Sequence, residues 1–181
     1  MCLKAVRGVM VMQPCSWTKL KLGWIDDSHV STIQAGQVET VTIDALGLGP
    51  TGISVIKVPL TQQQYYLVEV RDAVGADANL PTPDTVDRGA WRGVFVLAVN
   101  EATGGGESGT GIVRWINPQT QQPATYIMET MSAAFQVGES FSSPSFGVMT
   151  VKSKSGSSYQ VELNRASVIV YSITFSTNQT D

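Results

Sequence analysis

The sequence predicts an all-β protein, an antiparallel β-sandwich of the jelly-roll-like kind with at most one short helix. Three observations favour this fold class. About eight short stretches are rich in β-branched and aromatic residues, as strands are. Clusters of Gly, Pro, Asp and Ser separate these stretches, as turns do. Apolar residues hardly ever recur with the period of a helix.

The expected strands follow one another along most of the chain. Residues 38–43 (VETVTI) and 52–60 (GISVIKVPL) alternate between apolar and polar side chains, which is typical of a strand with one buried face. Residues 93–99 (GVFVLAV) form a continuous apolar run, which indicates a strand buried on both faces. The other expected strands are 65–70, 112–116, 148–152, 159–163 and 167–175.

The remaining segments complete the expected organisation. Residues 126–135 (YIMETMSAAF) are the one segment with a helical pattern, and residues 71–92 form a long acidic loop. We expect an irregular N-terminal segment over 1–15, a single sandwich domain over 16–175 and a disordered tail over 176–181.

Composition and charge exclude several classes of protein. Only 15% of the residues are charged, against roughly 25% in ordinary soluble domains. The net charge is −3 and no basic cluster occurs, so a nucleic-acid partner is not expected. The longest apolar run, residues 94–99, is too short for a transmembrane segment, and no signal peptide is evident in this chain. The only cysteines, Cys2 and Cys15, cannot staple the whole fold, although their spacing permits a local bridge.

The residues needed for a complete catalytic site are missing. His29 is the only histidine, which excludes the H-E-x-x-H pair of zinc proteases, and no G-x-S-x-G elbow flanks a serine. Cys15 would need His29 as its base, and a packed cysteine is the more common role for such a residue. The glycine-rich run 104–109 lacks the lysine of a phosphate-binding loop. We therefore expect no enzymatic activity from this chain on its own.

The acidic loop is the best candidate for a metal site. Oxygen ligands suit calcium, and the loop offers four carboxylates, those of Asp72, Asp77, Asp84 and Asp87. The D-x-D-x-D-G spacing of a calcium-binding loop is absent, so a solvated acidic loop without metal is the competing interpretation. Four tryptophans are scattered among the expected strands, which favours core or edge positions over a sugar-binding platform: Trp17, Trp24, Trp91 and Trp115.

Five segments in order resemble the immune-inhibitor-A type of secreted metalloproteases. They read SWTKLKLGWID (16–26), YYLVEVR (65–71), GVFVLAVNE (93–101), FQVGESF (135–141) and SKSGSSYQV (153–161). In that family a K-x-x-L-G-W segment closes the catalytic domain, and the strand motifs follow it. The resemblance covers roughly residues 16–163 and implies a β-sandwich behind a zinc-protease domain, an extracellular or cell-surface setting, and often bound calcium.

The chain also departs from the family pattern. The zinc-binding helix lies upstream of K-x-x-L-G-W in the family and is absent here, so no zinc is expected in this chain. In the apolar strand, Ala98 stands at the histidine position and Asn100 at the aspartate position. Asp77 matches the family's G-x-D position, which favours order in the acidic loop around it.

The leading hypothesis is a non-catalytic accessory or binding domain, a fragment or a domain acting alone, which resembles the C-terminal region of a secreted zinc metalloprotease. Its partner would be a protease catalytic domain, or an extracellular surface or glycan. Trp17, Leu22 and Trp24 would lie on the face toward the catalytic domain and form an apolar patch without it. The alternative is an independent extracellular carbohydrate-binding or adhesion module, which needs an aromatic row on one sheet face. A hydrolase with an unfamiliar site is a third hypothesis.

Overall fold

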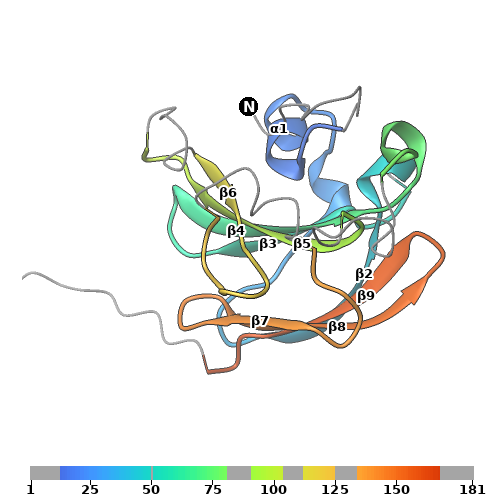
Figure 1. The fold of residues 1–181 in the computed structure, drawn as a ribbon. Helices are drawn as coiled ribbons and strands as arrows, with labels where there is room; N and C mark the ends of the chain where they lie inside the picture. The colour runs from blue at the N-terminus through green and yellow to red at the C-terminus, as the bar shows by residue number, and fades with distance from the viewer. Residues whose placement is uncertain (1–12, 50, 81–90, 104–111, 125–133, 168–181) are drawn as a thin grey trace, which may run out of the picture.

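The structure, a computed structural model, confirms an all-β protein built on two facing sheets. It describes residues 13–49, 51–80, 91–103, 112–124 and 134–167. Figure 1 shows the two sheets lying one above the other, with the short helix α1 (Ser16–Lys21) on the outer side of one of them. The described chain therefore forms three layers, which are the N-terminal segment with α1, a five-stranded sheet and a four-stranded sheet.

The five-stranded sheet has the strand order β1-β3-β4-β5-β6. Its strands are β1 (Val30–Thr32), β3 (Val55–Pro59), β4 (Gln64–Arg71), β5 (Gly93–Asn100) and β6 (Val113–Trp115). Strands β3 to β6 are antiparallel neighbours, and only the short edge strand β1 runs parallel to its neighbour β3. Strands β4 and β5 therefore lie inside the sheet, as the continuous apolar run at 93–99 predicts for β5.

The four-stranded sheet has the order β2-β9-β8-β7 and is wholly antiparallel. Its strands are β2 (Val38–Asp44), β7 (Ser140–Ser143), β8 (Gly147–Ser155) and β9 (Ser158–Asn164). Three 3-10 turns, η1 (Asp27–His29), η2 (Leu46–Leu48) and η3 (Gly75–Asp77), lie in the connections.

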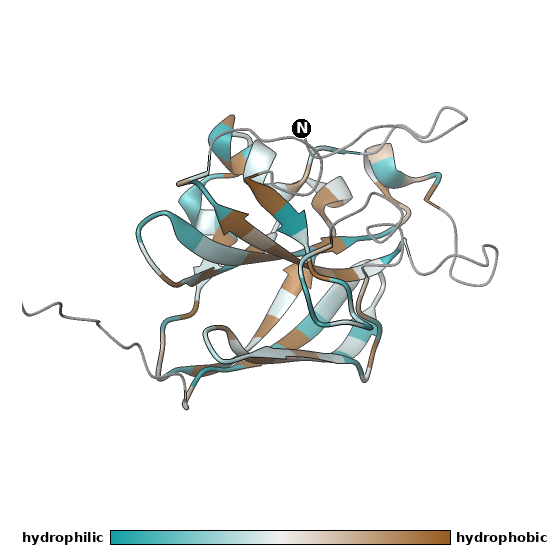
Figure 2. Ribbon diagram, turned by 60° about the vertical axis from the view of Figure 1, so that its left-hand side comes forward, coloured by the Kyte–Doolittle hydropathy of each residue, from teal (hydrophilic) through white to brown (hydrophobic). Residues whose placement is uncertain are grey.

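Two apolar clusters hold the layers together. The larger fills the space between the sheets and contains Val68, Val96, Phe141 and Val161 among others. The second lies on the outer face of the five-stranded sheet, where Leu67, Phe95 and Trp115 pack under the N-terminal segment. Hydrophobic residues accordingly gather along the strands in Figure 2. Successive residues of β4 and β5 point into opposite clusters, because side chains alternate along a strand, and residues 93–97 are all buried.

The structure adds elements that the sequence pattern did not indicate. The helix α1 and the short strands β1 and β7 were not predicted. The predicted helix over 126–135 lies outside the described residues apart from its last two positions, where Phe135 pairs with Val94 as an isolated bridge. Residues 168–175 of the last expected strand and the glycine-rich run 104–109 also lie outside the described residues. No helix among the described residues is long and apolar enough to cross a membrane.

Candidate functional site

The helix α1 ends in a glycine turn that fixes the residues after it. Gly23 adopts a positive φ of 69°, its N–H donates to the carbonyl of Leu20 at 3.1 Å, and the N–H of Trp24 donates to that of Lys19 at 2.8 Å. These two bonds define a Schellman motif, in which glycine takes the left-handed position just beyond the helix. The L-G-W part of the family-like segment is thus a helix stop.

Two apolar side chains next to this turn face solvent. Leu22 is 55% exposed and Trp24 is 58% exposed, although large apolar residues are usually buried. Trp17 is half-buried, and its indole N–H donates to the Glu101 carboxylate at 3.1 Å. We call Leu22 and Trp24 together the Leu22–Trp24 surface. Trp24 is therefore not the core or edge residue that its place among the expected strands indicated, although it belongs to the apolar patch expected around Trp17, Leu22 and Trp24.

A cluster of buried charges lies beneath α1. Arg71 and Glu69 are two residues apart on β4 and point to the same face, and Asp77 follows in η3. All three side chains are fully removed from solvent, with Arg71 Nε 2.8 Å from Glu69 Oε1 and Arg71 Nη1 3.1 Å from Asp77 Oδ2. We call these three residues the buried charge cluster.

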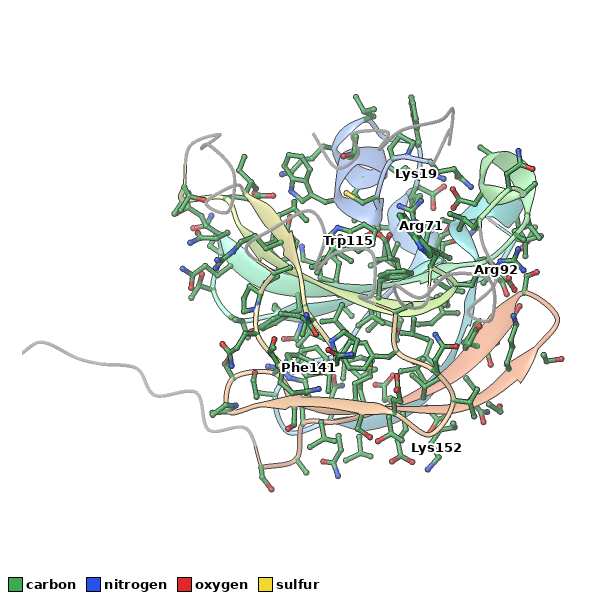
Figure 3. All side chains as sticks on the ribbon, in the orientation of Figure 1. Lys19, Arg71, Arg92, Trp115, Phe141 and Lys152 are labelled. Carbon is green, nitrogen blue, oxygen red and sulfur yellow. The ribbon has the colours of Figure 1, made fainter. Side chains whose placement is uncertain are left out.

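The buried charge cluster binds the backbone of the N-terminal segment. The N–H of Gln13 donates to Asp77 Oδ1 at 2.9 Å, and its carbonyl accepts from Arg71 Nη1 at 3.0 Å. The N–H of Ser16, at the start of α1, donates to Glu69 Oε2 at 2.6 Å. Figure 3 shows Lys19 and Arg71 one above the other between α1 and the five-stranded sheet. Because both ends of residues 13–16 are held, α1 has a fixed position on the sheet.

The pKa of Arg71 is raised, whereas the pKa of Lys19 is lowered. Burial alone would lower the pKa of Arg71, but the adjacent carboxylates of Glu69 and Asp77 outweigh it and the pKa is raised. Burial lowers the pKa of Lys19, and the positive charge of Arg71 lowers it further. Lys19 donates to the side-chain carbonyl of Gln13 and to the carbonyl of Leu46 at 3.1 Å, so it fastens α1 to η2.

A second polar cluster surrounds Glu101 at the other end of α1. Its carboxylate accepts from Lys21 at 2.8 Å, from the Tyr65 hydroxyl at 2.5 Å and from the indole of Trp17. Hydrogen bonds from Lys21 and then from Tyr65 lower the pKa of Glu101 to about 2. Burial and this hydrogen bond to Glu101 raise the pKa of the Tyr65 hydroxyl. Both clusters position α1. Within each cluster the charged groups pair with one another.

The candidate calcium ligands are only partly described. Asp77 belongs to the buried charge cluster, whereas Asp72 pairs with Lys154 at 2.8 Å. Asp84 and Asp87 lie outside the described residues. Among the described residues no group of three His, Cys, Asp or Glu side chains lies close enough to hold a metal ion. Calcium binding by this loop stays a prediction.

The only residues considered for thiol catalysis have other roles. Cys15 is disulfide-bonded and fully buried at the N-terminus of α1. Cys2, the other cysteine of the chain, lies outside the described residues. His29 lies in η1, and its Nδ1 is 2.8 Å from the carbonyl oxygen of Gly52.

A pocket of about 370 Å³ lies in the five-stranded sheet, where residues of β4, β5 and β6 line it. Ala98 and Asn100, the two positions at which the chain departs from the family-like strand motif, both line it. Tyr66 and Gln64 of β4 and Arg114 of β6 line it as well. The pocket is thus formed by side chains from three adjacent strands.

Sequence reasoning found the exposed Leu22–Trp24 surface but missed the buried charge cluster. The available signal was the pair Glu69 and Arg71, two residues apart within a strand-like run, which places both charges on one face. The neighbours on that face, Tyr65 and Leu67, are buried, so the charges had to be buried too. Comparison of the chain with protein-family models, curated proteins and solved structures finds no match in any of the three.

Proposed function

We propose that this chain is a non-catalytic accessory domain that binds another protein domain through α1 and the Leu22–Trp24 surface. The observation that carries the proposal is Trp24, an indole that is 58% exposed yet held at the end of a helix by two backbone hydrogen bonds. Tryptophan is the residue type most enriched among the few that dominate protein interfaces.

Rigidity supports a binding role for this surface. Residues 13–16 are held by three hydrogen bonds to the fully buried side chains of the buried charge cluster. A side chain on a fixed support loses less conformational entropy on binding than one on a loose loop. The surface is therefore preorganised for a partner.

The chemistry of the surroundings favours an apolar contact. Lys21, the charged residue next to Leu22, already pairs with Glu101. Binding through Leu22 and Trp24 would thus rest on the burial of apolar area rather than on charge. The resemblance to immune-inhibitor-A-type proteases, in which the corresponding segment closes the catalytic domain, favours a secreted zinc-protease catalytic domain as the partner and an extracellular setting for the contact.

Calorimetric titration with the catalytic domain of such a protease, produced without its C-terminal part, tests this proposal. We expect binding by the parent chain and a loss of affinity of about tenfold or more in Trp24→Ala, because truncation of an interface tryptophan costs over 1 kcal/mol. Val148→Ala, which shortens a 43% exposed side chain on β8, is the control and should bind as the parent does. Absence of binding by the parent, or equal binding by Trp24→Ala, would overturn the proposal.

Casein digestion with and without a chelator tests the non-catalytic part. The chain alone should leave casein intact under both conditions. Cleavage that the chelator abolishes would assign a metal-dependent hydrolase activity to the chain instead.

A further inference from the structure

We propose that the pocket formed by β4, β5 and β6 binds a neutral sugar ring. Leu22 and Trp24 are not among the described residues that line this pocket, and the inference does not depend on the proposed protein partner. Its volume of about 370 Å³ falls within the roughly 300–1,000 Å³ of small-molecule sites.

The register of the sheet places three side chains together at the floor of the pocket. Tyr66, Ala98 and Arg114 are directly opposite one another on adjacent strands and point to the same face of the sheet. The small methyl group of Ala98 therefore lies between two long side chains. Ala98 is partly exposed although it is on the face that packs against the other sheet, because the pocket opens above it.

Tyr66 provides a fixed aromatic wall. Its ring packs against Phe141 and Phe146, with centroids 5.9 and 5.1 Å away. Its hydroxyl makes no hydrogen bond within the described part of the chain. An aromatic ring whose hydroxyl has no partner among the described residues suits a sugar, which presents C–H groups on its faces and hydroxyls around its rim.

Two side-chain amides supply further hydrogen-bonding groups on the same face. Gln64 and Asn100 are opposite each other across β4 and β5, one step beyond Tyr66 and Ala98. Asn100 is held in place because its Oδ1 accepts from the N–H of Ala102 at 3.1 Å, which leaves its Nδ2 without a partner in the described chain. The Gln64 amide likewise has no hydrogen-bond partner among the described residues.

The charge of the described lining disfavours a cationic ligand. Among the described residues that line the pocket, Arg114 is the only charged one and no carboxylate occurs, so the site is unsuited to a cation. The apolar side chains of Leu60, Ile112 and Pro123 complete the walls. Neutral amides, a phenol and apolar walls together match the mixed surface of a hexopyranose.

Saturation-transfer NMR with glucose, galactose, mannose and N-acetylglucosamine at millimolar concentration tests the site. We expect transfer to at least one of these sugars from the parent chain, and none with Ala98→Leu, which fills the floor of the pocket. Gln64→Ala, at an exposed position where folding is not at risk, should weaken binding about tenfold. Ala78→Leu, a matched change at an exposed alanine after η3, should bind as the parent does.

Three outcomes would overturn the inference. The first is the absence of transfer to all four sugars, and the second is unchanged binding by both Ala98→Leu and Gln64→Ala. The third is binding of glucuronate or acetate without any neutral sugar, which would make the pocket an anion site of Arg114. Trp24→Ala should leave sugar binding unchanged, so that failure of this inference is distinguishable from failure of the proposed protein interface.

Discussion

A fully buried arginine is tolerated only where other groups replace the water that it loses. Arg71 meets this condition with two carboxylates and the carbonyl of Gln13, although its Nη2 has no partner among the described residues. Replacing such a cluster with apolar residues is often harmless in proteins, whereas removing one member leaves an uncompensated charge. The cluster is therefore better explained by the specific position it gives residues 13–16 than by a gain in stability.

Arg71→Met should lower the free energy of unfolding by ~3–5 kcal/mol, because Glu69 and Asp77 would remain buried without their cation. Urea unfolding followed by tryptophan fluorescence measures this loss. The control is Lys152→Met, which removes a surface pair to Glu162 at 3.5 Å and should cost about 0–1 kcal/mol. Equal losses in the two variants would show that the buried charge cluster is not coupled in the way its geometry indicates.

Glu101 should make stability depend on pH in the acidic range. Its pKa is lowered from 4.5 to about 2 in the folded protein, so folding stabilises the ionised form. This contribution is fully present above the unfolded pKa of 4.5 and is lost as the pH falls toward the folded value of about 2. The midpoint temperature of thermal unfolding should therefore fall less steeply with decreasing pH in Glu101→Gln than in the parent. Parallel profiles for Glu101→Gln and the parent would contradict the prediction.

At the scale of single elements, the sequence predicts the long strands well and misses several of the short elements. Strands β2, β4, β5, β8 and β9 coincide with the alternating or apolar runs. The helix α1 has six residues and β1 has three, too few to display a period. The strand β7 reads SFSS and lacks the β-branched residues that mark strands. The Leu-Gly-Trp stop was nevertheless a usable signal for a helix end before Gly23.

The pocket escaped prediction for a different reason. Its residues come from three strands and meet only through the register that aligns Tyr66, Ala98 and Arg114. Register depends on which faces are buried and on the turns between strands, and a single sequence does not specify these at the resolution of one residue. The expected exposure of Leu22 and Trp24 required no register, because it came from the resemblance of one continuous segment to the end of a catalytic domain.

Two glycines separate the cost of backbone strain from the cost of steric overlap. Gly147, at the start of β8, and Gly138, in the turn before β7, have φ values of 94° and 90°. A Cβ at Gly147 would lie 2.4 Å from the carbonyl oxygen of Asn164, whereas one at Gly138 would meet nothing within 4 Å. We expect Gly138→Ala to cost about 1 kcal/mol from strain alone and Gly147→Ala on the order of 3 kcal/mol. Denaturant unfolding compares the two, and equal costs would refute the close approach of β8 and β9.

At the scale of the whole molecule, the five-stranded sheet is the middle layer and both of its faces are covered. The continuous apolar run at 93–99 predicts this placement, and the structure confirms it. The two sheets meet at one end around Arg165, which follows β9 and is 1% exposed. Its backbone pairs with Gly36 and Gln37, in the connection from the five-stranded to the four-stranded sheet.

The guanidinium of Arg165 joins connections from both sheets. Its Nε donates to the carbonyl of Phe146 at 3.0 Å and its Nη1 to that of Ile33 at 2.8 Å. Its Nη2 donates to the carbonyls of Ser145 at 3.2 Å and Pro59 at 3.3 Å. Four carbonyls, three in two connections and one at the end of β3, therefore depend on one planar side chain.

Arg165→Lys should destabilise the protein although it keeps the charge. A lysine has one nitrogen with three donors and cannot reach carbonyls on opposite sides of a planar group. We expect a loss of ~2–4 kcal/mol, since each buried carbonyl left without its donor costs about 1–3 kcal/mol and partial relaxation recovers some of it. Lys152→Arg on the surface of β8 is the control and should stay within about 0.5 kcal/mol of the parent in urea unfolding. If Arg165→Lys is as stable as this control, the positive charge alone holds the two sheets together at this end, and the four hydrogen bonds of the guanidinium do not.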